Sequence, residues 1–331
     1  MIESIEFRNF KALREATLPL SRFTLIVGPN GSGKSTGLKG ITAFQNPGVY
    51  HHKNLRTAGV PETVPVGVTA RWTDADGAQV GSLLWSASEG TRVAYYVPNA
   101  SSQAVKVAEV LQGARIFALD AVAIAQPVQL QPNMEMAQSG ALLAGVLDRL
   151  RDQHPERFEA VNKELGRWVP EFDRILFETP GSGQRSMALR TREGHYPIKA
   201  VELSQGTLIA LALLTIANSA KPPSIVCLEE PDRGLHPRLL RDVKDALYRL
   251  AYPEGSGEKR EPVQVIATTH NPYFLDLFRE HPEEIVIAEK VGLESKFSRL
   301  SDRKDLNEIL ADAPLSEVWY SGVLGGVPAG T

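Results

Sequence analysis

The stretch Phe23-Thr24-Leu25-Ile26-Val27-Gly28-Pro29-Asn30-Gly31-Ser32-Gly33-Lys34-Ser35-Thr36 decides the fold of this chain. Residues 28–35 match the pattern G-x-x-x-x-G-K-[S/T] of a phosphate-binding loop. An apolar run of strand type precedes the loop, and residues 37–45 contain no proline and carry Leu38 and Ile41 at helical spacing. The pattern requires this context of strand, loop and helix, and the alternative is a chance glycine turn.

Each residue type in the loop has a chemical reason. Gly28 and Gly33 let the backbone curl so that its N–H groups converge on phosphate oxygens. A helix that begins near Lys34 adds the positive end of its dipole. We expect Lys34 to reach the terminal phosphates and the Ser35 hydroxyl to hold a Mg²⁺ ion. The sequence therefore predicts a site for ATP and Mg²⁺.

The bulk composition bounds the class of protein. The 331 residues can form one large domain or two lobes, and 43% apolar and 23% charged residues are ordinary values for a globular protein. A formal charge of −3 gives no attraction of the whole molecule to nucleic acid or membrane, although a local basic groove remains possible. The single cysteine, Cys227, excludes an internal disulfide and a cysteine zinc cluster, and we expect it to be buried.

The start and the apolar content of the chain bear on its location. The N-terminal residues Met1 to Glu6 are acidic and alternating, unlike a secretory signal. The most apolar stretch, residues 208–217, is too short to span a bilayer. A cytoplasmic protein without a membrane partner is therefore the expectation.

The periodicity of apolar residues predicts a mixed α/β protein. Alternation predicts strands at residues 2–7, 13–20, 64–72, 80–85 and 91–97. Continuous apolar runs predict buried strands at 23–27, 224–228 and 263–268, and shorter strands are expected at 174–178, 187–191 and 284–288. Helices are predicted over 134–168 with a break at Pro155, over 207–219 and over 237–252, and loops over 50–62 and 254–261. The sequence has no sustained heptad pattern, so a long coiled coil is not expected.

Two carboxylates follow one of the buried strands. The run Ile225-Val226-Cys227-Leu228 delivers Glu229 and Glu230 at its C-terminal end, where parallel α/β sheets bind ligands. Adjacent residues on a strand point in opposite directions. Glu229 is therefore the candidate metal ligand, and Glu230 the candidate general base or water-positioning residue. The alternative is an acidic helix N-terminus that the helix dipole stabilises.

Two further motifs stand at element ends. Leu203-Ser204-Gln205-Gly206-Thr207 directly precedes a predicted helix, so Ser204 is an N-cap candidate. The same N–H groups, with the Ser204 hydroxyl and a glycine at position 206, also suit a γ-phosphate. In Thr268-Thr269-His270-Asn271-Pro272, His270 ends a predicted strand and could bond to a phosphate or a water, or be structural.

Together these motifs resemble the ABC class of P-loop ATPases. Walker A corresponds to residues 28–35, the signature motif to 203–207, Walker B to 225–230 and the switch histidine to His270. Within that class the chain resembles the SMC/RecF/OLD branch of AAA family ATPases over nearly its whole length. The resemblance also rests on Asn9-Phe10-Lys11, on Glu229-Glu230-Pro231-Asp232-Arg233-Gly234-Leu235-His236-Pro237 and on the tail Leu315-Ser316-Glu317-Val318-Trp319-Tyr320-Ser321-Gly322.

The resemblance implies an ABC ATPase head with a RecA-like parallel core, an antiparallel β lobe and a helical signature lobe. It implies a single domain over residues 1–331, with a Walker A half at 1–130, a helical lobe at 131–203 and a signature, Walker B and switch-histidine half at 204–331. It assigns catalysis to Lys34, Glu230 and His270 and the metal to Ser35 and Glu229. It assigns nucleotide binding to Asn30, Gly31, Ser32, Gly33, Lys34, Ser35, Thr36, Ser204 and Gly206.

The resemblance also implies partners and a role. Two subunits of a homodimer, or of a higher homo-oligomer, are expected to sandwich ATP between the Walker A of one and the signature of the other. Hydrolysis of this ATP would make the dimer a switch in anti-phage defence or DNA repair, with a nuclease or toxin as effector in trans and DNA as a possible ligand. Two other functions stay open: the motor subunit of a transporter, and a nucleotide-gated scaffold with little turnover.

The chain departs from the family pattern at several points. Glu229 replaces the aspartate of most Walker B motifs, and residues 205–207 stand where many transporters carry G-G-Q. The glutamine of the Q-loop has several candidates, among them Gln126. About sixty residues follow His270 and contain no D-x-D pattern with an upstream glutamate in a fitting context, so a nuclease domain in the same chain is not expected.

Overall fold

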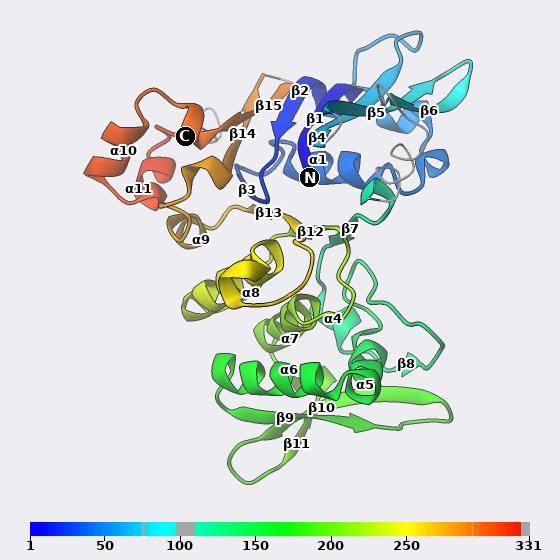
Figure 1. Cartoon of the computed structure of the whole chain (residues 1–331), viewed down its shortest axis with the longest axis vertical. Helices are drawn as coiled ribbons and strands as arrows, with labels where there is room; N and C mark the ends of the chain where they lie inside the picture. The colour runs from blue at the N-terminus through cyan, green and yellow to red at the C-terminus, as the bar shows by residue number, and fades with distance from the viewer. Residues whose placement is uncertain (75–76, 97–109, 293, 326–331) are drawn as a thin grey trace. The chain divides into compact units, whose positions relative to one another are not determined.

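The computed structural model describes residues 1–74, 77–96, 110–292 and 294–325 (Figure 1). Contacts between residues divide the chain into two compact units. Unit 1 comprises Met1–Ile116, Pro223–Leu228 and Pro262–Thr331, and unit 2 comprises Phe117–Pro222 and Glu229–Glu261. The division into one ATPase domain with three parts remains a prediction.

An antiparallel sheet forms one part of unit 1. Its strand order is β2-β1-β4-β5-β6, and each neighbouring pair is antiparallel. The strands are β1 (Ile2–Phe10), β2 (Leu13–Pro19), β4 (Val66–Asp74), β5 (Gly77–Ser86) and β6 (Gly90–Tyr96). Alternate side chains such as Ile5, Phe7, Val68, Leu83 and Trp85 are buried, which confirms the half-buried strands that the alternation predicts.

A second sheet of six strands has the order β15-β14-β3-β13-β12-β7. Its strands are β3 (Phe23–Val27), β7 (Arg115–Phe117), β12 (Ile225–Glu229), β13 (Gln264–Thr269), β14 (Ile285–Val291) and β15 (Glu294–Arg299). Strand β3 pairs in parallel with β13 and β14, and β14 pairs antiparallel with β15. All five residues of β3 are buried, as its uninterrupted apolar run predicts. This sheet is the parallel core.

Short helices complete unit 1. The α-helices are α1 (Lys34–Thr42), α2 (His52–Leu55), α9 (Pro272–Asp276), α10 (Leu306–Asp312) and α11 (Leu315–Tyr320), and the 3₁₀-helices are η1 (Pro47–Val49), η5 (Pro282–Glu284) and η6 (Leu300–Asp302). The prediction of an irregular loop over residues 50–62 was wrong at α2, which is one turn long and therefore has too few positions to show a period.

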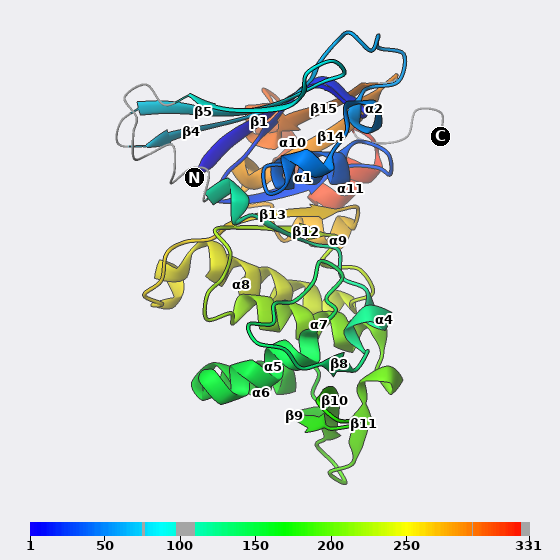
Figure 2. The same ribbon diagram turned by 90° about the vertical axis from the view of Figure 1, so that its right-hand side faces the viewer.

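Unit 2 is built from layers of helices on a small sheet. Figures 1 and 2 show α8, then α7, then α5 with α6, and then the strands β9 to β11, with β8 beside α5. The helices are α4 (Ala121–Ile124), α5 (Leu143–Gln153), α6 (Pro155–Trp168), α7 (Gln205–Ala217), α8 (Leu240–Ala251), η2 (Ala200–Glu202), η3 (Pro237–Leu239) and η4 (Pro253–Ser256). The strands are β8 (Val128–Gln129), β9 (Phe172–Glu178), β10 (Gln184–Thr191) and β11 (Pro197–Lys199). Every residue of α7 from Thr207 onward is buried, which explains why this helix is apolar all round.

The predicted helix over residues 134–168 was wrong in its first part. The helix α5 begins only at Leu143, because Gly140 and Leu142 have φ angles of 84° and 73° in the left-handed region. The predicted break at Pro155 is confirmed, since α6 begins there with proline in its first turn.

Candidate functional site

The loop of residues 28–33 connects β3 to α1, as the motif predicts. Gly28 has no room for a side chain, because a Cβ atom there would lie 2.3 Å from the carbonyl oxygen of Ala288. Gly33 has a φ of 96°, which other residues rarely adopt. A Cβ atom at Gly31, in contrast, would meet no described atom within 4 Å. The loop is therefore packed at both ends and open at its middle.

Lys34 folds back over the loop that precedes it. Its ammonium group donates to the carbonyl oxygens of Gly28 at 2.5 Å and Pro29 at 2.9 Å, and only 7% of the residue is exposed. Ser35, the next residue, is exposed. The charge of Lys34 is thus fixed at the loop, and the Ser35 hydroxyl is open to solvent at the first turn of α1.

The inner side of the loop holds a buried hydroxyl. Ser32 is fully buried, and its Oγ has no hydrogen-bond partner among the described residues. A Cβ atom at Gly28 would lie 2.8 Å from this oxygen. A cradle closed by glycines, with a lysine and two serine hydroxyls, is a donor set that fits phosphate oxygens and a hard cation.

His270 leaves the core sheet beside the loop. The parallel register pairs Thr269 of β13 with Val27 of β3, so His270 and Gly28 are the next residues on neighbouring strands. The Thr269 hydroxyl accepts a hydrogen bond from the Asn271 N–H at 2.9 Å, and the Asn271 side chain caps α9. This turn is held by the residues on either side of His270, whose own side chain is exposed.

Glu229 and Glu230 differ in backbone conformation. Glu229 is the last residue of β12, whereas Glu230 has a φ of 46° and accepts a hydrogen bond at its carbonyl from the Arg233 N–H at 3.0 Å. The alternation of strand side chains therefore reaches Glu229 only, and the chain turns at Glu230. Both residues are half-buried. No helix among the described residues begins at either glutamate, and η3 begins only at Pro237, so the alternative of an acidic helix N-terminus is wrong.

Ser204 caps helix α7, as predicted. Its hydroxyl accepts a hydrogen bond from the Thr207 N–H at 3.2 Å and lies 2.8 Å from the Thr207 hydroxyl. Ser204 is nevertheless exposed. Gly206 is constrained from within the chain, because a Cβ atom there would lie 2.7 Å from the carbonyl oxygen of Gly234.

The structure places the sequence-predicted residues in two groups. The loop residues 28–36 and His270 belong to unit 1, and Ser204, Gly206, Glu229 and Glu230 to unit 2.

Two further residues bear on the sequence-based predictions. The side-chain amide of Gln126, a Q-loop candidate, donates to the Val122 carbonyl within its own helical turn. Gly234 was missed by the sequence reasoning, although a glycine five residues after the Walker B strand is a signal that could have found it.

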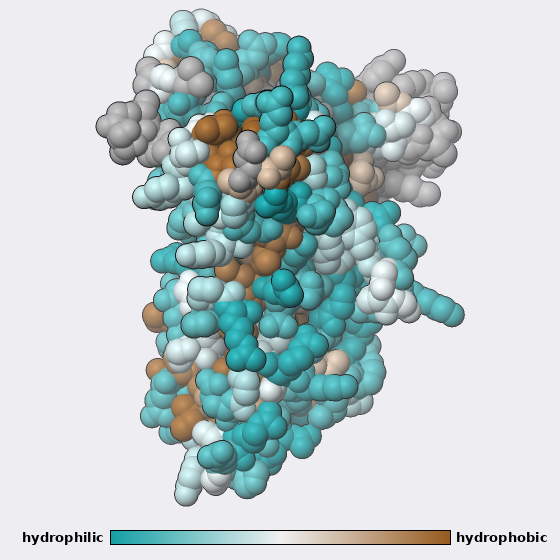
Figure 3. Space-filling model, turned by 90° about the vertical axis from the view of Figure 1, so that its left-hand side faces the viewer, coloured by the Kyte–Doolittle hydropathy of each residue, from teal (hydrophilic) through white to brown (hydrophobic). Residues whose placement is uncertain are grey.

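Cys227 is buried within β12, as predicted. Within the part of the chain that the structure describes, we find no helix with the length and apolar character of a membrane span. The face of the molecule in Figure 3 is mainly hydrophilic, with small hydrophobic patches.

Comparison with solved structures shows the fold. An Smc head bound to the C-winged helix domain of ScpA superposes with a TM-score of 0.66 at 17% identity, over 92% of this chain and 99% of that chain. An Smc head domain from Pyrococcus furiosus with an extended coiled coil, bound to the C-terminal domain of ScpA, gives 0.60 at 16% identity, over 94% and 100%. The fold is therefore that of an ABC-type SMC head.

Comparison of sequences agrees with the fold. An OLD nuclease of Thermus scotoductus is 24% identical, and the match covers 84% of this chain. The chain spans only 60% of the length of that relative. Residues 1–94 match the family described as "AAA ATPase domain". Residues 105–276, just over half of the chain, match the family described as "AAA domain, putative AbiEii toxin, Type IV TA system". The chain therefore belongs to this AAA domain family, with the fold of an SMC head and a sequence similar to that of an OLD nuclease.

Proposed function

We propose that this protein hydrolyses ATP and uses the cycle of binding and hydrolysis as a switch. The observation that carries the proposal is the loop itself: glycines leave it open at Gly31, and Lys34 is fixed against its carbonyl groups. The register of β3 and β13, which puts the residue after Val27 beside His270, supports a role for that histidine at the terminal phosphate.

The residues would act as follows. The N–H groups of residues 30–36 bind phosphate oxygens, and Lys34 neutralises the charge of the β- and γ-phosphates. Ser35 and Glu229 would hold Mg²⁺, and the charge of this ion would stabilise ADP as the leaving group. Glu230 accepts a proton from water while the water oxygen bonds to the γ-phosphorus and the bond from that phosphorus to the β,γ-bridging oxygen breaks. ADP, phosphate and one proton are the products.

The signature motif would act in trans. Ser204 is exposed at the start of a helix of thirteen residues, where N–H groups and a hydroxyl can receive the γ-phosphate of a second subunit. A head-to-tail homodimer would then close on two ATP molecules and open after hydrolysis. Higher homo-oligomers built from such dimers are compatible with the same contact.

The family suggests the biological setting. The name of the OLD relative includes a nuclease, and the description of the matched family includes a toxin. We propose a cytoplasmic role in anti-phage defence or DNA repair, in which a separate nuclease or toxin is the effector and DNA is a possible activating ligand. The nuclease activity in the name of that relative belongs to a longer protein, of which this chain spans 60%.

Steady-state release of phosphate, measured with and without DNA, tests the proposal. We expect the wild-type protein to release phosphate and Lys34→Ala to lose the activity, because the charge that stabilises the transition state is gone. Lys39→Ala is the matched control, since Lys39 lies exposed on the same helix.

The folding of Lys34→Ala must be checked, because the variant also loses two hydrogen bonds within the loop. Circular dichroism and thermal unfolding serve for this. Retention of most of the hydrolysis rate in a folded Lys34→Ala protein would exclude this site. Absence of turnover in the wild type, with ATP bound, would instead favour the nucleotide-gated scaffold.

A further inference from the structure

The segment after β12 is a compact pair of turns. The Arg233 N–H donates to the Glu230 carbonyl at 3.0 Å, and the Leu235 N–H donates to the Asp232 carbonyl at 3.2 Å. Asp232 and Leu235 are buried, with 6% and 9% of their surface exposed. Glu230 and Gly234 both have left-handed backbones, with φ angles of 46° and 72°. The conformation of the segment is therefore closely determined from one end to the other.

Helix α7 contacts this segment backbone to backbone. A Cβ atom at Gly206 would lie 2.7 Å from the Gly234 carbonyl oxygen and 3.9 Å from the Leu235 Cα. In return, a Cβ atom at Gly234 would lie 3.0 to 3.2 Å from the Gln205 side chain. Each glycine thus makes room for the other element. Both residues belong to unit 2.

We propose that this contact makes Gly206 and Gly234 positioning residues for hydrolysis, because it sets the place of Glu230 relative to the start of α7. The inference rests on the proposed role of Glu230 as the base. A contact between two backbones has no side-chain rotamers that could absorb a displacement. A shift of the first turn of α7 would therefore move Gly234, and through the turn hydrogen bond also Glu230.

The contact implies a second role for the signature motif. Ser204 and Gln205, at the start of α7, are the residues that a γ-phosphate from another subunit would meet first. Closure of the dimer at this point would then be transmitted within the same subunit to its own Glu230. The base would reach its working position only when the signature is engaged, which couples hydrolysis to closure.

The alternative is that the two glycines only allow the close packing of the two segments and have no effect on hydrolysis. Gly206→Ala separates the two explanations, because alanine is the better helix former and favours stability of α7 itself. In the positioning model, the added methyl group displaces Gly234 and Glu230. We then expect kcat to fall by about 10- to 100-fold, because a small displacement of a catalytic group has an effect of this size. The affinity for ATP should change by less than about 3-fold.

Two other glycines of unit 2 provide matched controls. Gly255, like Gly206, does not have a positive φ, and a Cβ atom there would meet no described atom within 4 Å. Gly257 has a φ of 73°, nearly that of Gly234, and is equally open. Gly255→Ala should keep the wild-type kcat. Gly257→Ala should show the strain of a left-handed alanine without loss of kcat, whereas Gly234→Ala should show both.

A measurement that does not need turnover keeps the inference separate from the proposed function. Hydrogen exchange of the full-length protein, followed by mass spectrometry of peptides over residues 230–236, reports on the segment directly. We expect faster exchange there in Gly206→Ala and unchanged exchange in Gly255→Ala. If the wild type proves inactive, the proposed function fails, and this exchange still decides whether the contact holds the segment.

The outcomes are distinct. Faster exchange together with a lower kcat and unchanged affinity supports the inference. Wild-type exchange and kcat in Gly206→Ala overturn it, and so does a loss of ATP affinity as large as the loss of kcat. A double variant with Glu230→Gln adds a further check, since Gly206→Ala should cost little more once the base is gone.

Discussion

Glu230 is held in a backbone conformation that few residues other than glycine adopt, at a φ of 46°. Such strain is retained where the surrounding structure fixes it, and it is concentrated at functional sites. Glu229, one residue earlier, still belongs to β12. The two carboxylates are therefore chemically alike but structurally different, which allows their roles to be separated by isosteric substitution.

We expect Glu230→Gln to bind ATP and to hydrolyse it at least about 100-fold more slowly, because the amide keeps the shape and removes the proton acceptor. With ATP and Mg²⁺ the variant should accumulate as a closed dimer, visible as a shift of mass in light scattering. Glu229→Gln is the companion variant and should instead raise the Mg²⁺ concentration that half-maximal hydrolysis needs. A normal rate in Glu230→Gln with an inactive Glu229→Gln would mean that the two roles are reversed.

The residues of the phosphate loop could be predicted from the sequence. The left-handed backbone at position 33 favours glycine, and the motif has a glycine at this position. The conformation of Glu230 could not be predicted, since a glutamate gives no sign of a left-handed backbone. The contact of Gly206 with the Gly234 carbonyl, 28 residues further along the chain, could not be predicted either, because it arises only from tertiary packing. The role of Gly206 at a phosphate stays a prediction.

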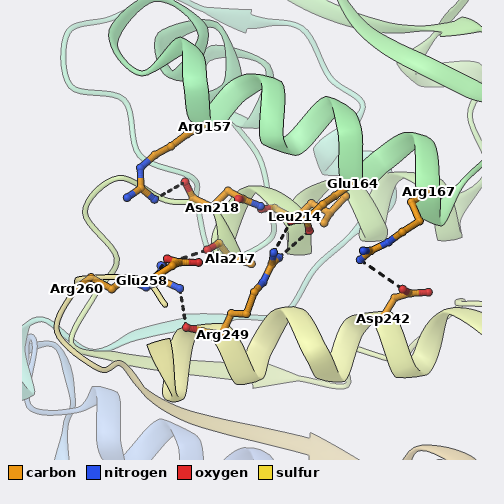
Figure 4. Close-up of polar contacts among 10 residues, drawn as sticks. All are labelled: Arg157, Glu164, Arg167, Leu214, Ala217, Asn218, Asp242, Arg249, Glu258 and Arg260. Carbon is orange, nitrogen blue, oxygen red and sulfur yellow. Dashed lines mark hydrogen bonds and ion pairs between the residues drawn. The ribbon is translucent and has the colours of Figure 1, made fainter. Parts of the chain in front are cut away.

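Among the secondary-structure elements, helices α6 and α8 are joined by charged side chains (Figure 4). Arg249 of α8 donates two hydrogen bonds to the Glu164 carboxylate of α6, at 2.5 and 2.7 Å. Hydrogen bonding to Glu164 raises the pKa of Arg249 above its usual value. Arg260 donates to the Arg249 carbonyl at 2.7 Å, which ties the loop after α8 to the same place.

A second ion pair joins the same two helices. Arg167 of α6 lies 3.6 Å from Asp242 of α8. Burial raises the pKa of the Asp242 carboxyl, and the charge of Arg167 opposes this rise. The longer distance and the greater exposure of both side chains to solvent make this pair weaker than the paired hydrogen bonds of Arg249.

We expect Arg249→Met to lower the free energy of unfolding by about 2–3 kcal/mol, because it leaves the largely buried Glu164 carboxylate without its partner. Arg174→Met is the matched control. It breaks the exposed pair of Arg174 with Glu159 on the same helix α6, which should cost less than about 1 kcal/mol. Urea unfolding of both variants measures the difference, and a Glu164→Gln, Arg249→Met double variant should recover part of the loss. Equal losses in both single variants would contradict the prediction.

Elements with a clear period could be predicted, whereas those formed by tertiary pairing could not. Strand β5 has buried residues at alternate positions, and the face that it buries against the core follows from that pattern. Strand β15 reads Glu-Ser-Lys-Phe-Ser-Arg, without a continuous apolar stripe, and it forms because β14 pairs with all six of its residues. Such a strand depends on its neighbour more than on its own sequence.

For the whole molecule, the motifs predict a site that one chain does not complete. The phosphate loop lies in unit 1 and the signature in unit 2, and the proposed dimer brings the signature of one subunit to the loop of another. Each motif has its own local pattern in the sequence. The dimer is expected from the family resemblance alone, because a surface that binds a copy of itself has no period or motif of its own, and it stays a prediction.

Ser204→Arg tests the dimer. We expect the variant to bind ATP and to lack hydrolysis, because the arginine occupies the space that the γ-phosphate of the other subunit needs. Asp120→Arg is the matched control, since Asp120 caps α4 of the same unit through its side chain. Loss of either cap should cost about 1 kcal/mol of stability, but only the Ser204 variant should lose hydrolysis.

Mixing Ser204→Arg with Lys34→Ala, each inactive alone, makes the test sharper. In a head-to-tail heterodimer, one composite site contains both substituted residues and the other contains only wild-type residues. Activity should therefore return on mixing. If the two sites act independently, a heterodimer should recover up to roughly half of the wild-type rate, and coupling between the sites would reduce this. Titration of one variant into the other, with phosphate release as the measurement, should give a maximum near equal amounts. If Ser204 is only a helix cap, Ser204→Arg will be less stable but active per folded molecule, mixing will follow the simple average of the two proteins, and the trans arrangement must be abandoned.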